Sequence, residues 1–263
     1  MRTRVKVTNR LLLSVVVSCS LSLAACTSLY SHQPPVGLRH DPGKPYKVWV
    51  YCIDSSLSPR SDEFRELQLV LGEAAENDVD YNDLVWLIQI GSIWEPPKLF
   101  EMPPRSPNMR RESRIAAETE LKNGKADLKH AIQRMAQISG TTDMGASLDA
   151  ARAILAKYAN ANSRNLVIGS DFINDLGHGK ASVDPPPTVL KNNLYGVNVD
   201  LLVTYPKPGY LKTVLCTTSA ELLQRVITVW TTYLRDDGAS SVNVLWVDAV
   251  PVSTSQLAKA IDQ

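Results

Sequence analysis

Cysteine and glycine are both scarce in this sequence, and neither residue is arranged for chemistry. None of the four cysteines lies in a redox CxxC pair or at the spacing of a zinc site. The 13 glycines do not cluster before a helix in the pattern that cradles phosphate groups, and no GxSxG nucleophile elbow is present. These absences exclude the common zinc, thiol redox, nucleotide-binding and serine hydrolase motifs. We therefore expect no enzymatic activity.

An excess of charge and a long apolar run are also missing. The formal net charge is +1, which gives no basic surplus for a polyanion, so we expect no nucleic-acid partner. After residue 25, no stretch approaches the roughly 20 apolar residues that a membrane-spanning helix requires. We therefore expect the mature chain to be water-soluble.

The first 25 residues, MRTRVKVTNRLLLSVVVSCSLSLAA, have a basic start, an apolar middle and small residues at the end. This order predicts a signal peptide for export. The junction Leu23-Ala24-Ala25-Cys26 resembles the lipobox of bacterial lipoproteins. The resemblance implies cleavage before Cys26 and attachment of lipid, including palmitate, to this residue. The alternative is an ordinary small-residue cleavage site followed by a chance cysteine.

Residues 26 to 44 are polar and rich in proline and glycine, so we expect a tether between the lipid and a domain over residues 45 to 263. Several acyl chains would hold the protein on a membrane almost irreversibly, because each buried methylene contributes about 0.8 kcal/mol. Thr27 follows the lipid site in place of Asp, which resembles lipoproteins sent to the outer membrane. We therefore expect a protein of the bacterial cell envelope, on the outer membrane facing the periplasm rather than on the inner membrane.

Two cysteines remain for a disulfide if Cys19 leaves with the leader and Cys26 carries lipid. These are Cys52 and Cys216, and an oxidising compartment would permit them to pair. Cys52 lies in a predicted core strand, where a free cysteine behaves as a small hydrophobic residue. The sequence leaves their pairing open.

Beyond Pro45, apolar strand-like segments alternate with helical patterns. This alternation is typical of a doubly wound, Rossmann-like α/β fold, with a mostly parallel sheet covered by helices on both faces. A short KLFEM strand is expected at an antiparallel edge. The predicted helices span residues 61–77, 111–122, 125–138, 144–159 and 218–235, and the predicted strands are KVWVYCI, LVWLIQI, NLVIGS, YGVNVDLLVTY and VNVLWVDAV.

Two strands end on polar segments, and ligands of such sheets bind beyond the carboxyl ends of strands. DSSLS places Asp54, Ser56 and Ser58 at alternate positions after the first strand, so their side chains can point to one side. NLVIGSDF ends a later strand at Asp171 in a similar way. An ordinary serine-rich turn is the alternative interpretation of DSSLS.

A third polar segment, SGTTDMGASL, lies directly before an amphipathic helix. The hydroxyl of Thr142 could reach the same edge of the sheet. The alternative is that Thr141, Thr142 or Asp143 only caps the helix.

The segments DSSLS, GTTDMGASL and VIGSDF, in this order, resemble the von Willebrand factor A (vWA) domain with its metal-ion-dependent adhesion site (MIDAS). The resemblance covers roughly residues 45 to 250 and is topological outside these segments. Phe172 is a departure, because many family members have glycine there. We expect it to keep the ligand in place and to reshape the rim. The resemblance implies a divalent metal site with the ligands Asp54, Ser56, Ser58, Thr142 and Asp171.

Hydroxyl and carboxylate oxygens without His or Cys suit Mg²⁺, Mn²⁺ or Ca²⁺ and fit Zn²⁺ or Cu²⁺ poorly. We expect Mg²⁺ first, with Mn²⁺ and Ca²⁺ as alternatives. The resemblance implies that a Glu or Asp of a protein partner completes the coordination of the ion. Asp143 and Asp175 are nearby carboxylates that are either outer partners of this site or solvated surface acids.

The sequence thus favours a membrane-tethered lipoprotein whose domain binds a protein partner through a divalent metal site. The alternative is a scaffold or assembly subunit of an envelope complex, which keeps the fold but uses other surfaces. An enzyme with Asp54 or Asp171 as phosphoryl acceptor, or with a serine as acyl nucleophile, is the least supported interpretation.

Replacement of Cys26 by Ser should leave the chain without acyl groups and release it into soluble fractions, because lipid is the expected membrane anchor. Fractionation and mass spectrometry of the mature amino terminus measure both effects. Unchanged membrane fractionation, with no lipid mass on the native terminus, would contradict the lipoprotein interpretation.

Overall fold

The computed structural model describes residues 40–56, 61–91, 95–105, 110–137, 142–175, 181–186, 194–204, 216 and 218–247. All of them lie in one compact unit, Leu38–Gln263. The predicted signal peptide, the tether up to residue 39, Cys26 and Ser58 lie outside the described residues. Among the described helices, none has the length and apolar character needed to cross a membrane.

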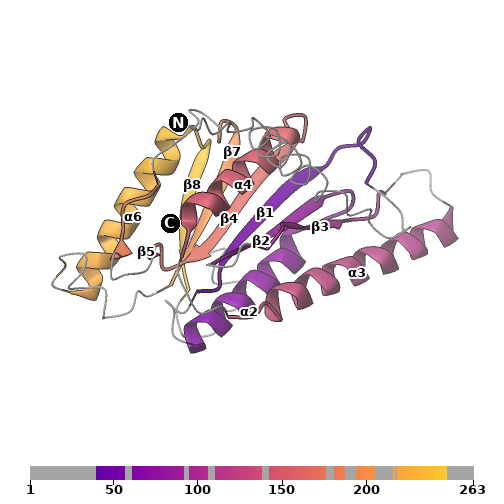
Figure 1. Ribbon diagram of the computed structural model, residues 1–263. Coiled ribbons are helices and arrows are strands. Elements are labelled where there is room, and N and C mark those ends of the chain that lie inside the picture. Colours follow the sequence, from indigo (N-terminus) through magenta and orange to yellow (C-terminus); the bar gives the residue numbers. More distant parts are fainter. Residues whose placement is uncertain are drawn as a thin grey trace, which may run out of the picture. The chain divides into compact units, whose positions relative to one another are not determined.

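A six-stranded sheet forms the centre of this unit, with the strand order β3-β2-β1-β4-β7-β8 (Figure 1). All neighbouring strands are parallel except β2 and β3, so β3 is the expected antiparallel edge strand. The order reverses between β1 and β4, which confirms the doubly wound fold. The strands are β1 Lys47–Asp54, β2 Leu84–Ile90, β3 Lys98–Glu101, β4 Ser163–Ser170, β7 Val197–Val203 and β8 Ser241–Trp246.

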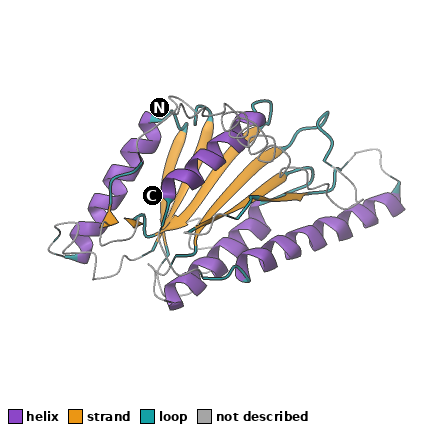
Figure 2. Cartoon of the chain, viewed as in Figure 1, coloured by secondary structure: helices purple, strands orange, loops and turns teal. Residues whose placement is uncertain are grey.

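Helices cover both faces of the sheet (Figure 2). On β1, Val48, Val50 and Cys52 belong to one core with α4 (Met144–Lys157) and α6 (Ser219–Asp236). The intervening residues Trp49, Tyr51 and Ile53 belong to a second core with α2 (Ser61–Asp78) and α3 (Arg111–Gln133). Successive side chains of a strand point to opposite faces, so a strand that is buried on both faces must be apolar throughout.

Helix α3 is a single helix, whereas the sequence predicted two helices over residues 111–122 and 125–138. The prediction of two helices was wrong, because the helix continues through Asn123 and Gly124. Glycine in a helix interior costs only about 1 kcal/mol relative to alanine, which packing can outweigh. A Cβ atom at Gly124 would lie 3.1 Å from the Met102 sulfur, so glycine allows α3 to pack closely on the segment after β3.

Cys52 and Cys216 are both buried, and no disulfide joins them. Burial raises the pKa of the Cys52 thiol, so the reactive thiolate is disfavoured. Cys52 therefore acts as a small apolar residue of the core.

A buried ion pair holds α4 against α6. Arg152 on α4 and Asp237 directly after α6 are each 2% exposed, and the Arg152 Nε donates to Asp237 Oδ2 at 2.8 Å. The same guanidinium donates to the Tyr233 hydroxyl at 2.7 Å and to Asp149 Oδ1 at 3.0 Å. Because α4 follows the segment that contains Thr142, this pair also stabilises one side of the candidate site.

Asp237→Ala should lower the free energy of unfolding by about 3 kcal/mol, because it leaves the buried Arg152 charge without its main partner. Asp149→Ala is the matched control: it removes a carboxylate from the same guanidinium, but its side chain is 53% exposed, so we expect less than about 1 kcal/mol. Urea unfolding of both variants measures the difference. Equal losses would show that the Asp237 pair has no special role.

Candidate metal centre

The candidate site lies at the carboxyl ends of β1 and β4, where the strand order reverses. Asp54 is the last residue of β1, and Asp171 directly follows β4. The parallel register pairs Ile53 with Gly169, so the next residues, Asp54 and Ser170, lie side by side. Open α/β sheets bind their ligands at such a point.

Four of the five predicted metal ligands are described, and all four are buried: Asp54, Thr142 and Asp171 are 0% exposed and Ser56 is 1% exposed. Thr142 Oγ1 lies 2.7 Å from Ser56 Oγ, in a hydrogen bond that joins two segments far apart in the chain. The backbone N–H of Ser56 donates to Asp54 Oδ1 at 2.9 Å. The structure therefore brings Asp54, Ser56 and Thr142 into one hydrogen-bonded cluster.

The turn interpretation and the site interpretation of DSSLS are compatible. The bond from the Ser56 N–H to the Asp54 carboxylate, two residues back, is the bond of an Asx turn. This bond holds the backbone so that the Ser56 hydroxyl can meet Thr142. Ser58, the third residue of the motif, lies outside the described residues, so its role stays a prediction.

The Asp54 carboxylate lies in an environment that disfavours its charged form. Burial raises the pKa of Asp54, while hydrogen bonds from Ser170 and Ser56 oppose the rise. The Ser170 hydroxyl donates to Asp54 Oδ2 at 2.6 Å. Among the described residues, no lysine, arginine or histidine forms an ion pair with Asp54. A buried carboxylate normally has a cation nearby, and hydroxyl and amide dipoles alone stabilise this one.

The loop after β4 turns sharply at Phe172, whose φ of 57° lies in the left-handed region. This conformation costs a non-glycine residue about 1–2 kcal/mol. The fully buried ring lies 5.3 Å from the Trp230 ring, between centroids, and burial of a phenylalanine contributes about 1.5–3 kcal/mol. The Phe172 carbonyl also accepts a bond from Trp230 Nε1 at 3.1 Å. The expectation that Phe172 reshapes the rim was wrong, because its ring points into the core.

Thr142 is held by the loop that follows Asp171. The Thr142 N–H donates to the carbonyl of Asp175 at 2.6 Å, and the Met144 N–H donates to Asn174 Oδ1 at 3.4 Å. The cap of α4 is Asp143, which accepts from the Ala146 N–H at 3.0 Å. Because Asp143 is the cap, the hydroxyl of Thr142 remains available to Ser56.

Ser170 connects the two strand ends and was not predicted from the sequence. Its hydroxyl donates to Asp54 and accepts from the Phe172 N–H at 2.9 Å, so it links the DSSLS segment to the turn at Phe172. A polar residue at the end of an apolar strand, directly before Asp171, was the available signal. It was not interpreted because serine is common where strands end.

The residues present fit a hard divalent cation. Their donor atoms are carboxylate and hydroxyl oxygens, which Mg²⁺, Mn²⁺ and Ca²⁺ prefer. The described part of the chain contains no group of three or more His, Cys, Asp or Glu side chains arranged to hold a metal ion. An ion at this edge would therefore depend on the hydroxyls of Ser56 and Thr142 as well as on the carboxylates.

No protein-family model matches this sequence, and no curated protein matches it. Among solved structures, it is similar to a von Willebrand factor type A protein from Catenulispora acidiphila, with 16% identity and a TM-score of 0.39 over 70% of this chain and 42% of that chain. An aerotolerance-related membrane protein from Bacteroides fragilis has 17% identity and a TM-score of 0.42, over 83% and 97% of the two chains. Proximal thread matrix protein 1 from the mussel byssus, whose MIDAS motif is occupied by zinc, has 12% identity and a TM-score of 0.41 over 82% and 45%.

The fold itself is established by the sheet, which is mostly parallel and six-stranded with one antiparallel edge strand and has helices on both faces. The three polar segments that suggested this fold from the sequence meet at one edge of the sheet.

Ser170→Ala should lower the free energy of unfolding by about 1–3 kcal/mol, because Asp54 loses a buried donor. It should also weaken Mg²⁺ binding by about tenfold or more, because groups that orient a metal ligand have effects of this size. Denaturant unfolding and calorimetric titration with Mg²⁺ measure the two effects.

Ser55→Ala is the matched control. Its buried hydroxyl donates to the Ile90 carbonyl at 2.9 Å and accepts from Gln89, toward β2 and away from Thr142. We expect a loss of stability with unchanged Mg²⁺ affinity. Equal effects of the two variants on Mg²⁺ affinity would refute a specific role of Ser170.

Proposed function

We propose that this chain is a membrane-tethered binding module that engages a protein partner through a divalent cation. The single observation that supports this most is the environment of Asp54. It is a fully buried carboxylate that has no basic partner among the described residues. It accepts from the Ser170 hydroxyl and from the Ser56 N–H, and Ser56 in turn bonds the hydroxyl of Thr142. Packing of the apolar core does not require such a polar cluster, and this cluster lies at the edge of the sheet where open α/β domains bind their ligands.

The residues that would hold the ion are Asp54, Ser56, Ser58, Thr142 and Asp171, and Mg²⁺ is the ion proposed first. When bound, the ion supplies a positive charge to which a carboxylate of the partner can attach. The chain positions the donor atoms before the ion arrives: Ser170 orients Asp54, the Asx turn orients Ser56, and the loop at Asp175 orients Thr142. Hydroxyls are neutral ligands, so the ion keeps more of its charge for the partner than it would among carboxylates alone.

The proposal is for binding and not for catalysis. The two described histidines lie elsewhere, His40 next to Asn82 before β2 and His130 on α3. His178 lies outside the described residues.

The tether enters the domain at the opposite edge of the sheet. Residues 40 to 46 lead directly into the amino end of β1, whereas Asp54 is its last residue. Eight residues of extended strand span roughly 25 Å. If Cys26 carries lipid on the outer membrane, as proposed, the tether joins the domain at one edge and the metal site presents itself to the periplasm at the other.

Metal binding is tested first, without a partner. Calorimetric titration with Mg²⁺, Mn²⁺, Ca²⁺ and Zn²⁺ should give saturable binding to the native chain and none to Asp54→Ala or Thr142→Ala. Zn²⁺ is included because a byssus protein of this fold has zinc in its MIDAS motif. Thr218→Ala is the control: it removes a threonine that caps α6 through the Glu221 N–H, and metal affinity should not change.

Partner binding is tested by capture from solubilised envelope, followed by titration with the captured protein. Chelator should weaken binding by about two orders of magnitude, because a partly buried charge-assisted contact is commonly worth a few kcal/mol. Asp54→Ala should have the same effect as chelator while the chain stays folded. Equal affinity with and without chelator would refute the metal-dependent binder and support the scaffold alternative.

A further inference from the structure

A cavity of about 310 Å³ lies at the amino-terminal edge of the sheet, at the other end of the strands from the metal site. It is lined by Lys44, Pro45, Tyr81, Asn82 and Arg105. Lys44 and Pro45 precede β1, Tyr81 and Asn82 precede β2, and Arg105 follows the antiparallel strand β3. Three segments far apart in the sequence therefore meet here, because β3 ends where its neighbours begin.

Asn82 builds the wall of this cavity. It is 3% exposed and adopts a φ of 66°, a conformation that asparagine tolerates better than most residues. Its side-chain amide donates to the carbonyls of Asp41 at 3.0 Å and Pro45 at 3.2 Å, and its Oδ1 accepts from the Asp41 N–H at 2.8 Å. The segment that enters the domain is thus held rigidly before any ligand binds.

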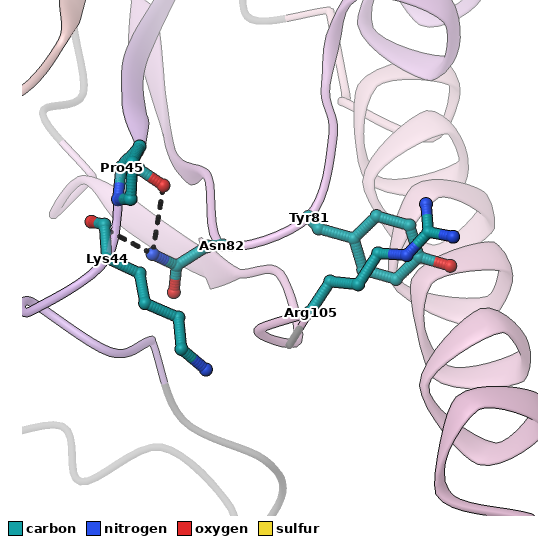
Figure 3. Close-up of a pocket in the computed structure, with 5 residues that line it drawn as sticks. All are labelled: Lys44, Pro45, Tyr81, Asn82 and Arg105. Carbon is teal, nitrogen blue, oxygen red and sulfur yellow. Dashed lines mark hydrogen bonds between the residues drawn. The ribbon is translucent and has the colours of Figure 1, made fainter. Parts of the chain in front are cut away.

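Two cationic side chains line the cavity, and they differ in whether a described carboxylate pairs with them. Figure 3 shows Lys44 and Pro45 on one side of Asn82, and Arg105 along the ring of Tyr81 on the other. The Arg105 guanidinium lies 5.2 Å from the centre of the ring, and among the described residues no carboxylate forms an ion pair with it. Lys44 forms an ion pair with Asp41 at 3.4 Å, but both side chains are partly exposed, so this pair is weak.

Arg105 affects the ionisation of the Tyr81 phenol. Burial and the nearby carboxylates of Glu118 and Asp80 raise the pKa of Tyr81, and Arg105 opposes the rise. The phenol beside the Arg105 guanidinium is therefore neutral, and Arg105 itself is exposed. An arginine that is stacked on a ring and has no carboxylate partner is pre-organised for an oxyanion.

We propose that this cavity binds a phosphate group, with Arg105 as the main contact, Lys44 as a second cation, and Pro45 and Tyr81 as apolar walls. A guanidinium matches phosphate because two parallel N–H groups can bond two of its oxygens, and lysine adds a point charge. The volume suits a small group and not an extended ligand. The phosphate can belong to an anionic lipid headgroup or to a free phosphate compound.

The test uses the full-length chain with Cys26→Ser, so that no acyl chain contributes to binding, and the leader contributes equally to every variant. One arm is flotation with vesicles of phosphatidylglycerol in phosphatidylethanolamine, against vesicles of phosphatidylcholine. The second arm is calorimetric titration with inorganic phosphate. Binding to the anionic vesicles that falls in the Lys44 and Arg105 variants identifies a headgroup as the source, and phosphate binding with no such change in vesicle binding identifies a free phosphate compound.

The variants distinguish the cavity from general charge. Lys44→Gln with Arg105→Gln should reduce binding about 25-fold, because each cation near an anionic surface contributes a factor of about five. Arg105→Gln alone should reduce binding more than Lys44→Gln alone. Arg225→Gln with Arg235→Gln on α6 removes the same charge from exposed positions and should leave phosphate binding unchanged.

Asp41→Asn provides a gain of affinity that loss of folding cannot imitate. It keeps the oxygen that accepts from the Gly43 N–H at 3.0 Å but removes the charge that pairs with Lys44, so binding should tighten. Binding of neither probe, or equal losses in the two double variants, would overturn the proposal. Unchanged Mg²⁺ binding in the Lys44 and Arg105 variants shows that any such failure is separate from the proposed metal site.

Discussion

The parallel pairing of β1 with β4 is the constraint on which the rest of this structure depends. Parallel neighbours cannot be joined by a tight turn, so the chain must cross over the sheet between them. All such strands end at the same edge, and the polar segments that follow them must meet there. The hydrogen bond between Ser170 and Asp54 is the direct result, because the register brings these two residues side by side although they are 116 positions apart in the chain.

The same constraint explains why the candidate metal centre is buried. β1 has a neighbour on each side, so Ile90 at the end of β2 and Ser170 at the end of β4 flank its end, and Thr142, before α4, bonds Ser56 there. Asp54 therefore loses contact with water while it keeps hydrogen bonds to a hydroxyl and a backbone N–H. Burial of a carboxylate in this way is unfavourable for stability. The set of oxygen donors at this edge is thus a property of the fold and of the three polar segments together.

The fold could be predicted from the sequence because its signals are local and repeated. Each central strand contains an apolar run, the helices have amphipathic patterns, and DSSLS and NLVIGSDF stand at strand ends. What could not be predicted depends on contacts between distant segments. Gly124 resembles a helix break until Met102 is seen against it, and the positive φ of Phe172 is acceptable only because Trp230 receives its ring. Ser170 had only a common signal, a polar residue at a strand end, because its function lies in the partner that the register gives it.

The position of Asn82 has a consequence for mechanical load. A pull on the entering segment, opposed by a ligand held at Asp54, acts along the axis of β1. Because the entering segment and Asp54 lie at the two ends of the same strand, the covalent backbone of β1 would carry this load, while hydrogen bonds to β2 and β4 keep the strand in the sheet. The segment before the strand is held by the amide of Asn82, which contacts the backbone at Asp41, Lys44 and Pro45. Force would therefore reach the sheet through a clamped entry point and would not peel β1 away one residue at a time.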